Sequence, residues 1–153
     1  MIKITSGLVH IEQVKQLITE YLTELDIDLT FQHVDQELAD LATTYQLPLG
    51  RLYIAFDDEI PVGCVGLKPL NSQSGEVKRL YVKPSYRKQH IANLLMTKLL
   101  EEAKLIGYQQ LYLDTLASLT QAVALYQKFG FKEIPPYYDN PLDHVIYFKL
   151  EIN

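Results

Sequence analysis

The apolar residues of this chain recur with two spacings, one typical of helices and one typical of strands. Steps of three and four residues predict amphipathic helices, several of which end at a proline or a glycine. The strongest of these patterns ends at Gly107, and a weaker one ends before Pro48. The expected helices are 9–25, 31–45, 87–106 and 119–129.

Short apolar or alternating stretches between the helices predict strands. These strands are 2–5, 51–56, 61–70, 76–82, 111–114, 131–134 and 145–152. Polar turns join the second, third and fourth strands into an antiparallel meander. The helix 87–106 then crosses over, so strand 111–114 should lie parallel to strand 76–82. This order predicts an α+β (mixed α/β) fold in which about four helices flank a central mixed, mostly antiparallel sheet.

The composition indicates one domain covering 1–153 and limits its partners. A net charge of −5 argues against nucleic acid as the main partner and slightly favours a cationic substrate. The single cysteine, Cys64, excludes an internal disulfide and favours a reducing compartment. The chain begins without a secretion signal and has no apolar stretch long enough for a membrane span. A cytoplasmic protein without a membrane partner is the expectation, and an exposed sheet edge would allow a homodimer.

Cysteine and histidine chemistry is not expected. Cys64 lies in an apolar strand without a neighbouring histidine, which favours a packing role over a nucleophilic one. The histidines show no spacing typical of metal ligands, so we expect no metal. They are His10, His33, His90 and His144.

The segment 76–92 carries the clearest candidate chemistry. A strand leads through a short turn into the start of the long helix, where unpaired backbone N–H groups and the helix dipole favour an anion. Arg87 and Lys88 add positive charge at that point. A bound diphosphate fits this pattern, and so does an ordinary strand-to-helix turn with two solvated cations.

The same segment resembles the coenzyme A-binding motif of the GNAT superfamily of acyl-CoA-dependent N-acetyltransferases, in particular its small single-domain bacterial members. That motif has Leu-Tyr-Val in a strand, then Pro, then Arg-x-x-Gly-x-Gly/Ala at the start of a helix. The matching residues are Leu80, Tyr81, Val82, Pro84, Arg87 and Ala92. A second family element, a helical tyrosine four residues before a Gly-Phe pair, is similar to Tyr126, Gly130 and Phe131.

The resemblance implies how acetyl-CoA would bind as a co-substrate. The backbone of Leu80 and Val82 would pair with the pantetheine amides, and a backbone N–H near Val82 would polarise the thioester carbonyl. The turn and helix start would hold the pyrophosphate. The residues of this turn are Arg87, Lys88, Gln89, His90, Ile91 and Ala92.

Two positions depart from the family pattern. His90 replaces the first motif glycine, where the backbone either adopts a positive φ at a cost or keeps ordinary helical geometry. Leu119 stands where the family often has an asparagine that binds the pantetheine arm, and Ser118 beside it is a partial substitute. These departures leave open a second hypothesis, a CoA-binding sensor or assembly module without turnover.

The resemblance also implies an enzyme in which an amine of a small molecule or peptide attacks the thioester directly. A protonated amine must lose a proton first, and Glu76 is the candidate base, with Asp114 and Asp139 as weaker alternatives. An exposed carboxylate at a strand end is the other interpretation of Glu76. Tyr126 is the candidate donor to the departing thiolate, although the same pattern suits a core tyrosine.

The loop 134–141 is the candidate acceptor site. It is rich in proline and aromatic residues and resembles a segment near the acceptor pocket of bacterial relatives. Tyr137 and Tyr138 would form a wall of this pocket, and Asp139 would face the amine. A surface loop stiffened by prolines has the same composition.

Overall fold

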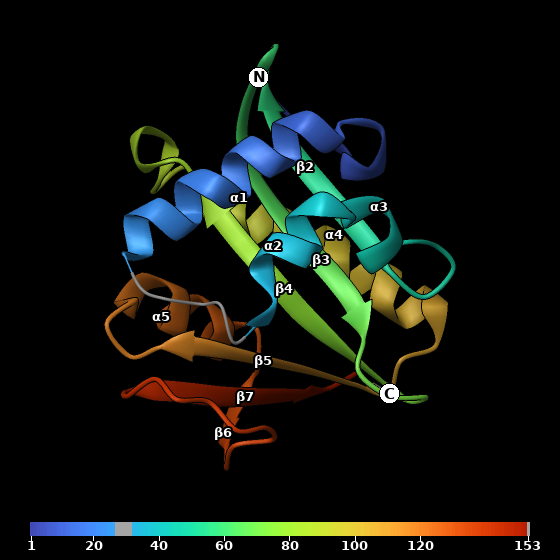
Figure 1. Cartoon of the computed structure of the whole chain (residues 1–153), viewed down its shortest axis with the longest axis vertical. Helices are drawn as coiled ribbons and strands as arrows, with labels where there is room; N and C mark the ends of the chain where they lie inside the picture. The colour runs from blue at the N-terminus through green and yellow to red at the C-terminus, as the bar shows by residue number, and fades with distance from the viewer. Residues whose placement is uncertain (27–31, 153) are drawn as a thin grey trace.

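Residues 1–26 and 32–152, which the computed structural model describes, form one seven-stranded sheet with helices on both faces (Figure 1). The strand order is β1-β2-β3-β4-β5-β7-β6. The strands are β1 (Ile2–Ser6), β2 (Arg51–Asp57), β3 (Ile60–Pro69), β4 (Ser74–Val82), β5 (Gln110–Leu116), β6 (Lys132–Ile134) and β7 (Val145–Glu151). The helices are α1 (Ile11–Leu25), α2 (Val34–Ala39), α3 (Leu41–Thr44), α4 (Ile91–Ile106) and α5 (Thr120–Lys128), with 3-10 turns η1 (Gly7–Val9) and η3 (Pro84–Tyr86).

The parallel pair β4–β5 confirms the predicted crossover through α4. The other neighbouring strands are antiparallel, so the mixed, mostly antiparallel sheet is also confirmed. The pairing of β4 with β5 is short and ends at Glu76 opposite Tyr112. Beyond this pair the two strands diverge and leave a fork in the middle of the sheet.

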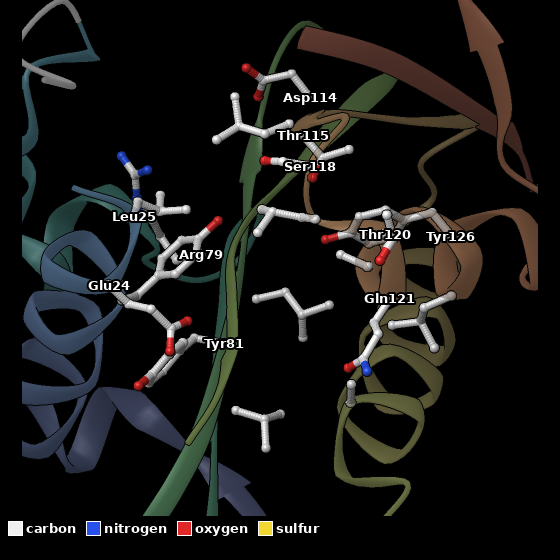
Figure 2. A pocket seen from close by; sticks show the side chains of 18 of the residues that line it. Glu24, Leu25, Arg79, Tyr81, Asp114, Thr115, Ser118, Thr120, Gln121 and Tyr126 are labelled. Atoms are coloured by element: carbon white, nitrogen blue, oxygen red, sulfur yellow. The ribbon is translucent and has the colours of Figure 1, made fainter. Parts of the chain in front are cut away.

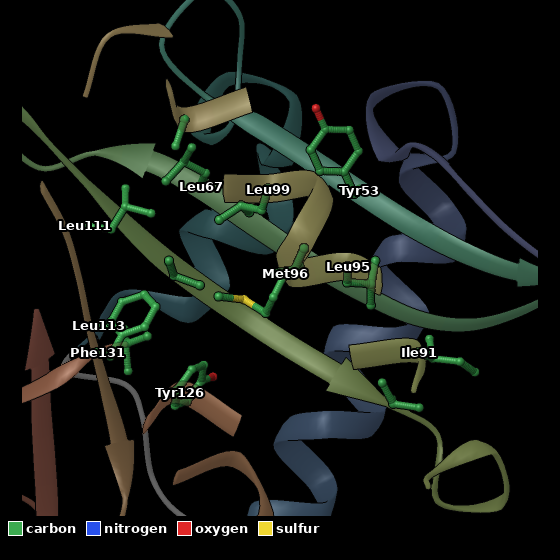
Figure 3. Close-up of a cluster of buried hydrophobic side chains, with 14 of the residues drawn as sticks. Tyr53, Leu67, Ile91, Leu95, Met96, Leu99, Leu111, Leu113, Tyr126 and Phe131 are labelled. Atoms are coloured by element: carbon green, nitrogen blue, oxygen red, sulfur yellow. The ribbon is translucent and has the colours of Figure 1, made fainter. Parts of the chain in front are cut away.

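Two apolar clusters fix the helices on the sheet. On one face, α4 buries Leu95, Met96 and Leu99 against the strands (Figure 3). On the other face, α1 buries Leu17 and Ile18. Both helices contact β3 and β4, so each face of the fork has a helix beside it.

The expected helix 87–106 begins four residues late, at Ile91. Lys88 and His90 adopt positive φ angles of 66° and 64°, which a helix cannot contain. The expected helix 31–45 is two short helices, because Asp40 between them leaves helical geometry at φ −141°. Phe31, the first residue of that pattern, lies outside the described residues.

The final strand was predicted to be half-buried, and this is wrong for its middle. Tyr147 is 6% exposed although it lies on the face opposite to the buried Phe148. Its ring contacts the rings of Tyr137 and Tyr138, with centroids 5.6 and 5.8 Å away. The loop 134–141 therefore covers the second face of β7, which strand periodicity alone does not reveal.

Candidate active site

A cavity of about 770 Å³ passes through the fork between β4 and β5. In Figure 2, Glu24 and Arg79 lie on one side of β4 and Tyr126 lies on the other. The side that holds the start of α4 and α5 is called the donor side below, and the side that holds α1 and α2 is called the acceptor side. The cavity therefore connects two surfaces that the sheet would otherwise separate.

A β-bulge shapes β4 along this cavity. Lys78 pairs with Gly66 and Tyr81 pairs with Cys64, so two residues of β4 face one residue of β3. Arg79, in the bulge, has a φ of 61°. The bulge shifts the alternation, so Val77 packs on the α4 face whereas Tyr81 packs on the α1 face.

The backbone of β4 faces the fork beyond the bulge. The N–H of Lys83 donates to the carbonyl of Val62 at 2.8 Å, so it points toward β3. Alternate residues of a strand direct their backbone groups to opposite sides. The N–H and C=O of Val82, and by the same alternation those of Leu80, therefore point into the fork.

The start of α4 presents backbone N–H groups, and two residues just before it have left-handed backbone conformations. Lys88 and His90 have positive φ angles. His90 is left-handed and Ile91 begins the right-handed helix, a succession that brings N–H groups together into a concave set suited to anions. The His90 ring itself is exposed and lies 3.3 Å from the amide nitrogen of Asn93. Of the two possibilities for His90, the structure has the positive φ rather than helical geometry.

Arg87 points away from this turn toward the acceptor side. Its Nη2 donates to Glu24 Oε2 at 2.6 Å and its Nε donates to the carbonyl of Val82 at 3.0 Å. The guanidinium also lies 5.8 Å from the ring centre of Tyr81. Arg87 thus joins the turn to α1 across the cavity wall.

Tyr126 lies at the inner end of the donor side. It is 7% exposed, and its ring packs against Phe148 and against Phe131, which Figure 3 shows beside it. Burial, and then the nearby Tyr21 and Asp114, raise the pKa of Tyr126 far above its usual value. The phenol therefore remains protonated at physiological pH while it lines the cavity.

Two carboxylates on the acceptor side are held by tyrosines of the loop 134–141. The Tyr137 hydroxyl donates to Glu76 Oε2 at 2.7 Å, and the Tyr138 hydroxyl donates to Asp114 Oδ2. Asn140 Nδ2 donates to the same Asp114 oxygen at 3.3 Å. Burial together with these carboxylates raises the pKa of both tyrosines.

A buried ion pair anchors α2 to the bulge. Arg79 donates from Nε and Nη2 to Glu37 at 3.0 and 2.9 Å, and from Nη1 to Gln32 at 3.0 Å. The Tyr45 hydroxyl donates to Glu37 at 2.8 Å. Burial alone would raise the pKa of Glu37, but the bonds and charge of Arg79 outweigh it and lower that pKa. This Arg79–Glu37 pair fixes the acceptor side against β4.

A model of the acetyltransferase (GNAT) family matches residues 11–131, which is most of the chain. The chain belongs to the GNAT acetyltransferase family. An uncharacterized N-acetyltransferase of Schizosaccharomyces pombe is 41% identical over 94% of this chain and 89% of the relative. The chain is therefore an acyl-CoA-dependent acetyltransferase.

Solved GNAT structures share its fold. An acetyltransferase of the GNAT family from Staphylococcus aureus superposes with a TM-score of 0.83 over the whole of both chains at 22% identity. A GNAT acetyltransferase from Elizabethkingia anophelis, solved with acetyl-CoA bound, is 28% identical over 75% of this chain and 82% of its own, with a TM-score of 0.59. The GNAT-like fold expected from the sequence is thus confirmed.

The residues of this GNAT protein fit an acyl-CoA. The outward backbone of Leu80 and Val82 offers strand-like pairing to an extended amide chain, and the start of α4 offers N–H groups to phosphates. Both belong to one cavity with Tyr126 at its inner end. Of the expected cofactor residues, the cavity wall includes Leu80, Val82, Arg87, Lys88, Ala92 and Ser118, together with Leu119.

The other expected residues lie farther from the cavity. Gln89, His90 and Ile91 do not line the cavity, and Ile91 is buried where α4 packs on the sheet. Glu76 is 5% exposed and lies inside β4, so the interpretation as an exposed strand-end carboxylate is wrong. Asp114 lines the cavity, whereas Glu76, Tyr137, Tyr138 and the exposed Asp139 do not.

Several cavity residues were missed by the sequence interpretation. Lys78 faces the same side as Glu76, a position that the two-residue period of a strand could have revealed. Arg79 faces that side only because of the bulge. Gln32 and Asn140 are distant in sequence from β4, and only the tertiary structure brings them to the cavity. Cys64 was correctly interpreted as a packing residue, since it is fully buried and burial raises its pKa to about 12.

No helix among the described residues is both long and apolar enough to cross a bilayer. The longest of them, α4, has 16 residues, several of them charged.

Proposed function

We propose that this enzyme transfers an acetyl group from acetyl-CoA to a primary amine by direct attack, without a covalent enzyme intermediate. One observation carries the proposal: the cavity runs through the fork and has Asp114 at its acceptor side and Tyr126 at its donor side. A thioester held in the fork would meet an amine that enters from the opposite face. The relative solved with acetyl-CoA bound supports acetyl as the transferred group.

The acceptor side must first neutralise the amine. An alkylamine has a pKa near 10.4, so most molecules arrive protonated at neutral pH. Asp114 lines the cavity and is held in place by Tyr138 and Asn140, so we propose that it accepts this proton, directly or through a water. Glu76 accepts a hydrogen bond from Tyr137 but does not line the cavity, so it is the second candidate.

Bond changes then balance as an acyl transfer. Asp114 first passes the proton of the ammonium group on to solvent. The neutral amine nitrogen then forms a bond to the acyl carbon, the C–S bond breaks, and the second proton that the nitrogen releases passes to Asp114. The N–H groups of β4 that face the fork stabilise the negative charge that develops on the carbonyl oxygen. Tyr126 donates a hydrogen bond to the departing sulfur. Its raised pKa disfavours transfer of the phenolic proton, so the thiolate takes up a proton later from solvent.

Release of free thiol from acetyl-CoA over a panel of primary amines tests this function. Tyr126→Phe should lower kcat by roughly 100-fold, the lower end of the range for loss of one hydrogen-bond donor to a developing negative charge, with an unchanged Kd for CoA. Tyr53→Phe is the matched control, because Tyr53 is also a buried tyrosine of the same core but lies outside the cavity. Equal loss of kcat and CoA affinity in Tyr126→Phe would assign the tyrosine to packing.

Variants of the two carboxylates test the choice of base. Asp114→Asn should lower kcat/KM more than Glu76→Gln, and the loss should shrink at high pH, where more of the amine is already neutral. The reverse ranking would move the proton acceptor to Glu76. If the protein binds CoA but releases no thiol with any amine, the non-catalytic CoA-binding module replaces the enzyme.

A further inference from the structure

Lys78 and Asp114 occupy matching positions on the two diverging strands. The last β4–β5 pair is Glu76 with Tyr112, so two residues farther along Lys78 would stand opposite Asp114 if pairing continued. Paired residues of a parallel sheet point to the same face. The side chains of the last pair do lie on one face, because Tyr137 donates a hydrogen bond to Glu76 and its ring contacts the ring of Tyr112.

The fork keeps this charged pair apart. Lys78 and Asp114 both line the cavity, yet no ion pair joins them within the part of the chain that the structure describes. Asp114 accepts its hydrogen bonds from Tyr138 and Asn140 instead. A positive and a negative group therefore face one cavity across the opening of the strands.

Among the described residues, no carboxylate lies within ion-pair distance of the Lys78 ammonium. Its partner on β3 is Gly66, which has no side chain to offer. The adjacent Arg79 is positive and directs its guanidinium to Glu37 and Gln32. Burial, followed by the charge of Arg79, lowers the pKa of Lys78, whereas Glu76, Asp114 and Glu37 act in the opposite direction. An anion in the cavity would relieve this cost.

We propose that the acceptor is an amino acid, or a similarly small molecule that bears a carboxylate close to its reacting amine, and that Lys78 binds this carboxylate. This inference rests on the proposed function. Asp114 faces the amine of the same molecule, so the two strands recognise opposite charges of a zwitterion. The carboxylate takes no part in bond changes, and Lys78 is a specificity-determining residue.

Pairs of acceptors that differ in this charge test the proposal. L-Amino acids and their primary amides share the position of the amine and the side chain, but the amide lacks the negative charge and its amine is less basic. The effect of Lys78→Met is therefore compared within each acceptor, where the amine is the same. The kcat/KM of the wild type should be higher for the acid of each pair. Lys78→Met should lower kcat/KM for the acids by roughly 10- to 100-fold, mainly by raising KM, as expected for the loss of a charged hydrogen bond. The amides should change less than about three-fold on the same scale.

Two further variants separate recognition from folding and from general electrostatics. Lys78→Arg keeps the charge and should recover much of the preference for acids. Lys104→Met removes an exposed lysine of α4 outside the cavity and should behave as wild type. An equal loss for acids and amides in Lys78→Met would make Lys78 a neutralising partner of the nearby carboxylates and would overturn the proposal.

A binding measurement keeps the test independent of turnover. N-acetyl-L-amino acids and their amides are the corresponding product pairs, and calorimetric titration into the CoA-loaded protein measures their affinity. Tighter binding of the acids that is lost in Lys78→Met supports the inference even where thiol release is absent, in which case only the proposed function fails. Efficient acetylation of amines with no preference for a carboxylate would support the proposed function and contradict the inference about Lys78.

Discussion

The two sides of the fork use different parts of the chain to make a site. Apart from Tyr126, the donor side relies on backbone groups: the outward N–H and C=O of β4 and the left-handed turn before α4. The acceptor side relies on charged side chains, with the Arg79–Glu37 pair behind Lys78 and Asp114. Under the proposed function, one surface would hold a constant co-substrate while the side chains of the other would determine the choice of acceptor.

Breaking the Arg79–Glu37 pair should give the largest loss of stability. Arg79→Met leaves Glu37 charged at 9% exposure without its partner, which costs about 3–5 kcal/mol for a buried pair. Urea unfolding measures the loss. Activity should fall as well, because Gln32 loses its anchor at the acceptor side.

The double variant Arg79→Met/Glu37→Leu provides the control. It should regain part of the stability, since no unpaired charge remains, although the Tyr45 hydroxyl loses its acceptor. If both variants are equally unstable, lost packing rather than the unpaired charge explains the single substitution.

Leu99→Ala should destabilise the donor side without changing acceptor choice. Leu99 is fully buried under α4, and truncation of such a leucine costs about 2–5 kcal/mol. The ratio of kcat/KM between acid and amide acceptors should remain that of wild type. A changed ratio would show that the two sides are coupled through the core.

Acid should weaken the Arg79–Glu37 pair of the acceptor side. The pKa of Glu37 is lowered from its usual value near 4.5, so its carboxylate stabilises the fold above that value. This contribution is lost as the pH falls through the lowered pKa. Unfolding free energies measured between pH 6 and pH 3, roughly the window around that value, should fall less steeply for Arg79→Met/Glu37→Leu than for wild type. Equal slopes of unfolding free energy against pH would show that Glu37 does not contribute to the loss of stability in acid.

The donor side was largely predictable from the sequence, and the acceptor side was not. The order of elements along the chain, the crossover and the turn before α4 follow from local periodicity and from a motif contained within 76–92. The acceptor side instead joins residues that are 42, 61 and 24 positions apart, as in the bonds of Arg79, Tyr137 and Tyr138. Local patterns carry no information on such pairs.

The bulge in β4 adds a second limit. Strict alternation would place Val77 and Tyr81 on one face of the sheet, but the structure places them on opposite faces. The bulge residue Arg79 has a positive φ without being a glycine, so no residue type marks its position. The cavity wall therefore could not be derived from the strand pattern.

His90→Gly should produce the smallest effect and a gain rather than a loss. His90 holds a φ of 64° at the start of α4, a conformation that glycine adopts without the clash of a Cβ. We expect about 0.5–1 kcal/mol of added stability in urea unfolding, reduced from the full left-handed cost by the greater freedom of glycine in the unfolded chain.

His90→Ala separates the backbone from the ring, because it removes the imidazole and keeps the Cβ. Alanine should be no more stable than wild type, since the strained φ remains. If the backbone alone serves the donor side, the Kd for CoA should differ by less than about three-fold among the three proteins, which is within 0.7 kcal/mol. A similar loss of CoA affinity in both variants would instead give the imidazole a direct contact, and CoA binding on the donor side would then depend on a side chain as well as on the backbone.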